Sequence, residues 1–285
     1  MTPAVRNTQF NTATSGTSVT ITKPTGLVAG DFLVAYLSFT AGGSGSITVP
    51  TGWTSQGVVN MDDDFRQYGV LTKIADAGDI SASDFTFSIS RSINTLIGQL
   101  VAIQNVPQTS TVRTFAISAN APNTTALSFT ASATPLTINS LLLIGFAARS
   151  GGSGSDTIGS YASTPSNTFT ELADNVVSSS VQSIASATLT SLSEITAYSA
   201  TISNIKVFHA GSILVITAPQ NASAEVAHLD SLPTINGVVA TNNVVIDGVS
   251  HLAIVPTLNG VSSRTNNPIW TPQVKTATTW TPEIK

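Results

Sequence analysis

The chain has 285 residues, of which 41% are hydrophobic and 9% charged, with a formal net charge of −4 and no cysteine. This length suffices for one large all-β domain or two smaller ones. The absence of cysteine excludes disulfides, thiolate metal sites and a cysteine nucleophile. The sequence has no stripe of Lys and Arg that would favour nucleic-acid binding. It also has no run of about 18 apolar residues, so no membrane span is predicted.

Residues 1–15 do not resemble a secretory signal, because no basic segment is followed by an apolar one. We interpret them as an N-terminal arm that could dock on a partner. Ser, Thr, Asn and Gly largely replace charged residues throughout the chain. Such a polar, nearly uncharged surface is more typical of an extracellular or particle-bound protein than of a cytosolic enzyme.

Residues 16–219 show short apolar–polar alternations separated by Gly, Pro, Ser and Asn. This pattern predicts many strands and almost no helix, because no segment has a sustained 3.6-residue period with caps. The predicted strands are Ser18–Thr22, Asp31–Phe39, Tyr68–Ile74, Phe85–Ile89, Leu96–Ile103, Ala126–Ala131, Leu141–Ala148, Val181–Leu189 and Ser212–Thr217.

The second group of strands repeats the first at an offset of about 110 residues, which indicates a duplication with halves at about 16–107 and 111–219. The halves could interleave into one jelly-roll-like sandwich of about fourteen strands, or form two sandwiches in tandem. We favour the single fused sandwich, because the link between the halves is short. The matching segments are Asp31–Leu37 with Ser140–Phe146, Gly52–Thr54 with Thr168–Thr170, and Gly98–Ile103 with Gly211–Ile216.

Residues 220–264 begin with a polar linker and then contain two Asn-Gly pairs, at 236–237 and 259–260, with Asp247-Gly248 between them. Asn-Gly and Asp-Gly between apolar residues are strong hairpin signals. We predict a small β-meander with strands near 234–240, 244–246 and 252–258. A meander of this size is not stable alone, so it must pack on the sandwich or on a neighbouring subunit.

Residues 265–285 form an extended tail in which the hexamer W-T-P-[QE]-[VI]-K occurs twice. Each Pro opposes helix formation, and an extended tail cannot bury two indoles against itself. Aromatic side chains commonly anchor protein interfaces. The expected partner-binding residues are Trp270, Pro272, Val274, Lys275, Trp280, Pro282, Ile284 and Lys285.

No motif for catalysis is evident, and no cofactor is expected. His209, His228 and His251 are far apart and lack metal-ligand spacing, so we interpret them as surface or structural residues. A glycosidase would need two carboxylates at a set separation; Glu171, Asp174 and Glu194 are present without a spacing that supports this role.

One acidic run and three aromatic residues near it suggest alternatives to a purely structural role. Asp62, Asp63 and Asp64 could bind Ca²⁺, but they lack the spacing and the Gly of an EF-hand, so a solvated loop is favoured. Trp53, Phe65 and Tyr68 lie near the same loop and could contact a glycan. A Trp that enters a sandwich is more often part of the core.

The first half contains S-V-T-I-T-K-P-T-G-L-V-A-G-D-F-L-V-A from Ser18, then V-P-T-G-W-T, Y-G-V-L-T-K-I-A and G-Q-L-V-A-I-Q-N-V, and the second half contains N-S-L-L-L from Asn139. These motifs resemble a β-sandwich module of tailed-bacteriophage structural proteins and some bacterial surface proteins. The repeated W-T-P-x-x-K resembles tails of phage minor virion proteins. The resemblance covers roughly residues 16–219 and the last sixteen, and it carries no catalytic residues.

The resemblance implies a structural component of a bacteriophage virion, of the tail, fibre or capsid-decoration type. Its partners would be other virion proteins and further copies of the chain, since symmetric homo-oligomers are the default in such particles. The chain would be made in the host cytoplasm and exposed on the particle. The alternative is a glycan-binding adhesion module that recognises host surface carbohydrate.

Overall fold

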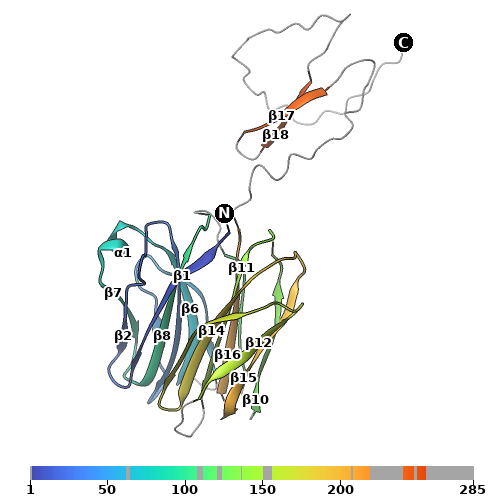
Figure 1. Cartoon of the computed structure of the whole chain (residues 1–285). Coiled ribbons are helices and arrows are strands. Elements are labelled where there is room, and N and C mark those ends of the chain that lie inside the picture. The colour runs from blue at the N-terminus through green and yellow to red at the C-terminus, as the bar shows by residue number, and fades with distance from the viewer. Residues whose placement is uncertain are drawn as a thin grey trace, which may run out of the picture. The chain divides into compact units, whose positions relative to one another are not determined.

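The computed structural model describes residues 2–61, 65–107, 112–120, 124–135, 137–149, 156–206, 208–218, 240–246 and 249–254. The chain divides into two compact units, residues 1–220 and 221–285. The structure is 66% strand and 3% helix, with several antiparallel sheets, which confirms the predicted all-β sandwich. The first unit contains two halves that lie side by side (Figure 1).

The first half has eight strands and one short helix, arranged in two antiparallel sheets. The five-stranded sheet has the order β1-β8-β3-β6-β5, and the three-stranded sheet has the order β2-β7-β4. The elements are β1 (Ala4–Ala13), β2 (Ser18–Thr22), β3 (Phe32–Ala41), β4 (Ile47–Thr48), β5 (Thr54–Asn60), β6 (Arg66–Ile74), α1 (Ala77–Ser81), β7 (Asp84–Ile89) and β8 (Ile93–Gln104).

The second half repeats this arrangement with eight further strands. Its five-stranded sheet has the order β13-β14-β11-β16-β9, and its three-stranded sheet has the order β10-β15-β12. The strands are β9 (Val112–Asn120), β10 (Thr124–Ala133), β11 (Leu141–Arg149), β12 (Ile158–Thr164), β13 (Thr170–Val177), β14 (Ser180–Thr188), β15 (Ile195–Lys206) and β16 (Phe208–Ile216).

Both halves have jelly-roll-like topology. In the first half, β1 pairs with β8, β2 with β7 and β3 with β6, which are the pairings of one long hairpin folded over into two sheets. The second half pairs β9 with β16, β10 with β15 and β11 with β14 in the same way. In each half the fifth strand joins the larger sheet, because β5 pairs with β6 and β13 with β14.

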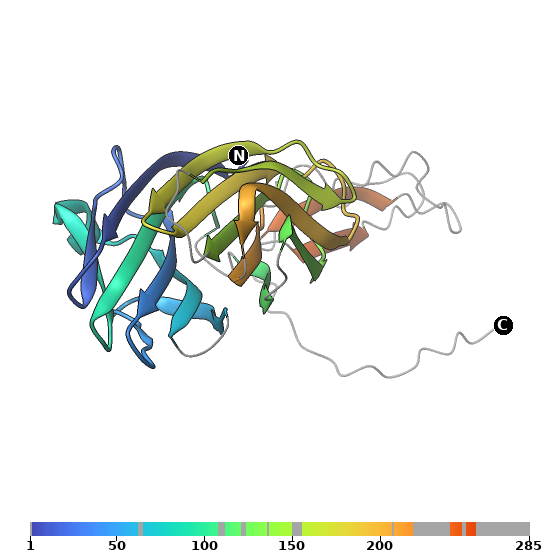
Figure 2. The same ribbon diagram turned by 90° about the horizontal axis from the view of Figure 1, so that it is seen from below.

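The expectation that strands of the two halves interleave is wrong. Every pairing between described strands of this unit lies within one half, so the halves are two sandwiches in tandem. The physical reason is that each half buries a core of its own between its two sheets. The halves are nonetheless joined, because a third core contains residues of both five-stranded sheets. Figure 2 shows the two halves side by side from below.

The central strands explain the longest apolar runs of the sequence. All ten residues of β3 are buried. Leu33, Ala35 and Leu37 face the first core, whereas Val34 and Tyr36 face the core between the halves. A strand with both faces covered needs no apolar–polar alternation, which is why this run could be recognised as a buried strand.

The residues expected to form an N-terminal arm instead form β1, the edge strand next to β8. None of its residues is buried, so its sequence lacks the apolar alternation of a covered strand. Backbone pairing holds it in place, together with an ion pair from Arg6 to Asp31 at the start of β3. Nε of Arg6 lies 2.6 Å from Oδ2 of Asp31, and Nη2 lies 3.1 Å from Oδ1.

In the second unit, the described residues form an antiparallel hairpin of β17 (Ala240–Ile246) and β18 (Val249–Ile254). The predicted turn at Asp247-Gly248 falls between these strands, although these two residues lie outside the described ones. The strand bounds differ from those predicted, and both Asn-Gly pairs lie outside the described residues. Among the described residues, no helix is long and apolar enough to cross a membrane.

Candidate functional site

Two of the predicted sites cannot be assessed from the structure. The partner-binding residues of the tail, from Trp270 to Lys285, lie outside the described residues, and so do Asp62, Asp63 and Asp64. The roles given to them therefore remain predictions.

Trp53 lies at the edge of the first core. Its ring packs edge-on against Phe87 at 5.1 Å between centroids and against Phe85 at 6.1 Å. It is half-buried and contacts the first core, just before β5 begins. Phe169 has the same place before β13 and contacts the second core. The repeated aromatic position is therefore a core position in both halves, as the structural interpretation of Trp53 expected.

The proposed glycan contact at Tyr68 is wrong, because Tyr68 has no exposed surface. It lies on β6 and faces the second half, where its hydroxyl is 2.7 Å from Oγ of Ser212. Burial raises the pKa of this hydroxyl well above its ordinary value. Phe65, which precedes β6, is 40% exposed. The three aromatic residues therefore do not share one exposed face.

The structure brings together a group of side chains that the sequence did not link, here called the polar cluster: Tyr161, Glu171, Asp174 and Ser183. Tyr161 on β12 contacts Oγ of Ser183 on β14 and lies 3.2 Å from Oε2 of Glu171 on β13. Its hydroxyl also lies 2.8 Å from the carbonyl oxygen of Ile158. One hydroxyl proton cannot serve all of these acceptors, so Tyr161 can donate to only one of them at a time, while the Ser183 hydroxyl also has the carbonyl oxygen of Ala173 as an acceptor at 2.8 Å.

Asp174 has the most perturbed carboxyl in this cluster. Burial raises its pKa from 3.8 to about 6, with smaller contributions from the charges of Glu171 and Asp156, while a hydrogen bond from the Ile158 amide opposes the rise. That amide lies 3.0 Å from Oδ2 of Asp174. A carboxyl with a raised pKa is one property of catalytic acids, but it also arises wherever a carboxylate is partly buried for structural reasons.

Two positions of the polar cluster have counterparts without polar side chains in the first half, whereas Glu171 corresponds to Ser55. The strand registers match Val58 with Asp174 and Gly69 with Ser183, because each pair faces its neighbour at the same step along β5–β6 and β13–β14. A Cβ at Gly69 would lie 2.6 Å from Cδ1 of Ile47, so an aliphatic side chain from β4 fills this space. The polar cluster therefore occupies the place of core contacts, which favours a structural role.

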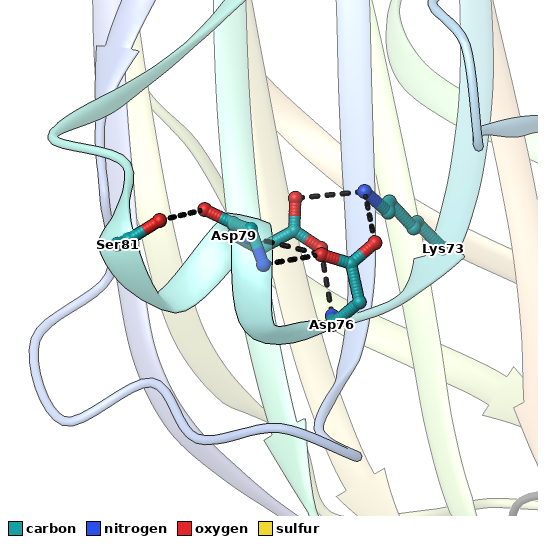
Figure 3. Close-up of polar contacts among 5 residues, drawn as sticks. Lys73, Asp76, Asp79 and Ser81 are labelled. Carbon is teal, nitrogen blue, oxygen red and sulfur yellow. Dashed lines mark hydrogen bonds and ion pairs between the residues drawn. The ribbon is translucent and has the colours of Figure 1, made fainter.

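A second polar group, at the end of β6, caps α1 (Figure 3). Oδ1 of Asp76 accepts from the amides of Gly78 (2.7 Å) and Asp79 (3.1 Å), while Asp79 accepts a bond from the Asp76 amide at 2.9 Å, which makes a capping box. Lys73 lies 2.7 Å from Asp79 and 3.1 Å from Asp76. The hydrogen bond from Lys73 lowers the pKa of Asp76 below its ordinary value.

This group was missed in the sequence, although Asp-x-x-Asp before a short segment is a capping signal. All of its members have partners within the group, so it stabilises the turn between β6 and β7. Ser81 adds a bond from its hydroxyl to the carbonyl oxygen of Gly78.

The other polar candidates are dispersed. His209 is fully buried on β16, which rules out the surface interpretation and leaves the structural one. His251 lies on β18 and His228 lies outside the described residues. Glu194 accepts a hydrogen bond from Ser132, which is not a member of the polar cluster. Within the described part of the chain, no group of three or more His, Cys, Asp and Glu could hold a metal ion.

Comparison with known proteins adds no assignment. No protein-family model matches the chain, and neither a curated protein nor a solved structure matches it significantly. A proposal for the function therefore depends on the geometry of the described residues and on the motifs of the sequence.

Proposed function

We propose that this chain is a non-enzymatic structural component of a bacteriophage virion, anchored through its C-terminal segment. The observation that carries the proposal is the tandem W-T-P-x-x-K at residues 270–275 and 280–285, which follows two sandwiches whose motifs resemble phage modules. The all-β fold supports it, since jelly-roll-like sandwiches are common in capsid proteins. The polar groups described above serve the fold, as expected of a structural protein.

The proposed mechanism of attachment is burial of the two Trp side chains, with Val274 and Ile284, in pockets of a partner subunit. Fully buried aromatic anchors contribute most of the binding energy at many interfaces. The partner is a further copy of the chain or another virion protein. Sugar binding at Trp53, Phe65 and Tyr68 is not proposed, because Tyr68 is buried and Trp53 packs on the first core.

Two measurements test the proposal. Mass spectrometry of purified particles, from a host that encodes the chain, should detect its peptides; their absence would show the proposal to be wrong. Light scattering then compares the full chain with Trp270→Ala/Trp280→Ala and with a control, Thr271→Ala/Thr281→Ala, that keeps both indoles. If the full chain and the Thr control are multimers and the Trp variant is a monomer, the tail mediates self-association. A monomer in all three cases excludes self-association of the purified chain and directs the search for the partner to other virion proteins.

A further inference from the structure

The two five-stranded sheets contact each other through residues that correspond between the halves. Tyr36 on β3 pairs with Gln99 on β8, and Gly145 on β11 pairs with Ser212 on β16. Since β3 and β11 have the same place in the two halves, Tyr36 corresponds to Gly145 and Gln99 to Ser212. Two residues further along, Ser38 faces Tyr68 on β6 and Ala147 faces Gln182 on β14. Tyr68 therefore corresponds to Gln182.

One hydrogen bond between the halves has a counterpart with the halves exchanged. Tyr68 of the first half meets Ser212 of the second at 2.7 Å. The corresponding pair is Gln182 of the second half with Gln99 of the first, where Nε2 of Gln182 lies 3.1 Å from Oε1 of Gln99. Nε2 of Gln182 also lies 3.1 Å from the carbonyl oxygen of Tyr36.

A second reciprocal pair of contacts lies nearer the end of the strands. Thr40 faces both Thr95 and Arg66 across its neighbouring strands. The corresponding residue of β11 is Arg149, which faces Phe208 and Ser180 across its neighbouring strands. Thr95 lies 3.2 Å from Ser180, and its counterpart Phe208 lies under the guanidinium of Arg66 at 4.2 Å. Reciprocal contacts of this kind are the property of a two-fold interface between like subunits.

At one position of this interface the two halves differ strongly in side-chain size. Tyr36 is fully buried and stacks on Tyr68, with ring centroids 6.5 Å apart. Its counterpart is Gly145, where a Cβ would lie only 2.7 Å from Cε1 of Tyr36 and would also collide with the hydroxyl of Tyr68. The large side chain of the first half therefore occupies the space left by the missing side chain of the second.

We propose that Tyr36 and Gly145 form a knob and hole that selects the pairing of unlike halves. The five-stranded sheet of each half is an association surface of one common pattern. Two first halves would place Tyr36 against Tyr36, and two second halves would leave a void at Gly145. Overpacking and cavities both cost stability, so only the unlike pair is well packed. The partner that fits each sheet is the sheet of the opposite half.

The inference is tested in the full chain with a double-mutant cycle made in a Tyr68→Phe background, because the Tyr68 hydroxyl is the atom nearest to the Cβ position of Gly145 and would meet a side chain there whether or not Tyr36 is present. Gly145→Ala should lower the melting temperature by roughly 5 °C or more when Tyr36 is present, because the new methyl group meets its ring. In a Tyr36→Ala background, the same substitution should have less than half of this effect. Equal losses in the two backgrounds would overturn the proposal, because Tyr36 would then not be what fills the hole.

Gly211→Ala is the matched control. Gly211 lies on β16, and a Cβ there would lie 2.6 Å from Cδ2 of Phe129, inside the second half's own core. Its effect on the melting temperature should be the same with Tyr36 and with Tyr36→Ala, since it does not face the interface.

A swap variant tests the two-fold reciprocity itself. In the same Tyr68→Phe background, which removes the hydroxyl next to Gly145, Tyr36→Gly/Gly145→Tyr moves the knob to the second half and the hole to the first. It should recover more than half of the melting-temperature loss summed over the two single changes. Losses that simply add would refute a two-fold interface. If Gly145→Tyr alone does not fold, the swap variant still decides the question, because an additive interface predicts that it does not fold either.

Discussion

The carboxyl of Asp174 provides a test of how partial burial makes the stability of the second half depend on pH. Its pKa is raised from 3.8 to about 6 in the folded protein, chiefly by burial. Between these values the folded protein holds a proton that the unfolded chain has released. The ionised carboxylate therefore costs stability above about pH 6, and this cost disappears as the pH falls from about 6 to about 4.

The size of the effect follows from the shift. About two pKa units correspond to about 3 kcal/mol at most. Asp174 is only half-buried, so solvent screening reduces the expected effect to about 1 kcal/mol. Asp174→Asn removes the charge and keeps an oxygen that can accept the Ile158 amide bond of 3.0 Å. The variant should be more stable than the wild type by about 1 kcal/mol at pH 7.5 and equal to it at pH 4.

The assay is urea unfolding of both proteins at several pH values between 4 and 7.5, with the difference in unfolding free energy as the readout. Using the difference cancels the titration of carboxylates elsewhere in the chain. Glu171→Gln serves as a control, since it removes a neighbouring negative charge and should give a smaller gain at neutral pH. A difference that is constant with pH, or that favours the wild type at pH 7.5, would refute the reasoning.

Three further predictions concern buried polar groups, each measured as a shift in denaturant midpoint. The hydroxyl of Tyr36 is buried with no hydrogen-bond partner among the described residues, so Tyr36→Phe should stabilise the protein by about 1 kcal/mol; a loss would contradict this. Tyr68→Phe should cost about 1–2 kcal/mol because it leaves Ser212 unpaired, and adding Ser212→Ala should recover part of the loss. Arg6→Ala should cost about 2–3 kcal/mol, because Asp31 is 3% exposed and would lose its charged partner; no change would mean that β1 is held by its backbone alone.

The sequence predicted best those strands whose two faces are covered. The runs at β3 and β11 are continuously apolar because one face meets the core of a half and the other meets the opposite half. The edge strands β1 and β5 were missed, since backbone pairing holds them and their side chains are mostly exposed or half-buried. Local sequence patterns contain little information about such strands, because their stability comes from neighbours that are distant in the chain.

The same limit explains the errors at the predicted site. The position of Tyr68 near a polar loop predicts an accessible side chain, but its environment is created by Ser212, which is 144 residues away in the sequence. Likewise, no local signal links Tyr161 with Asp174, because β12 and β13 belong to different sheets. The capping box at Asp76 and Asp79 depends only on neighbours within four residues, so this feature was open to prediction.

The apolar face between the halves bears on how the duplicated fold arose. In a half standing alone, Val34, Val101 and Ile103 would be exposed on the outer face of the five-stranded sheet, and all three have no exposed surface here. An apolar face of this kind requires a partner. The contacts between the halves include two reciprocal pairs, Tyr68–Ser212 with Gln182–Gln99 and Thr95–Ser180 with Phe208–Arg66, which is the pattern of two related domains that pair through the same face. This is the expected result if a pair of identical domains was fused and the two copies then diverged. Both copies kept the apolar face of the five-stranded sheet, while the residues at the centre of the interface changed to favour the pairing within one chain.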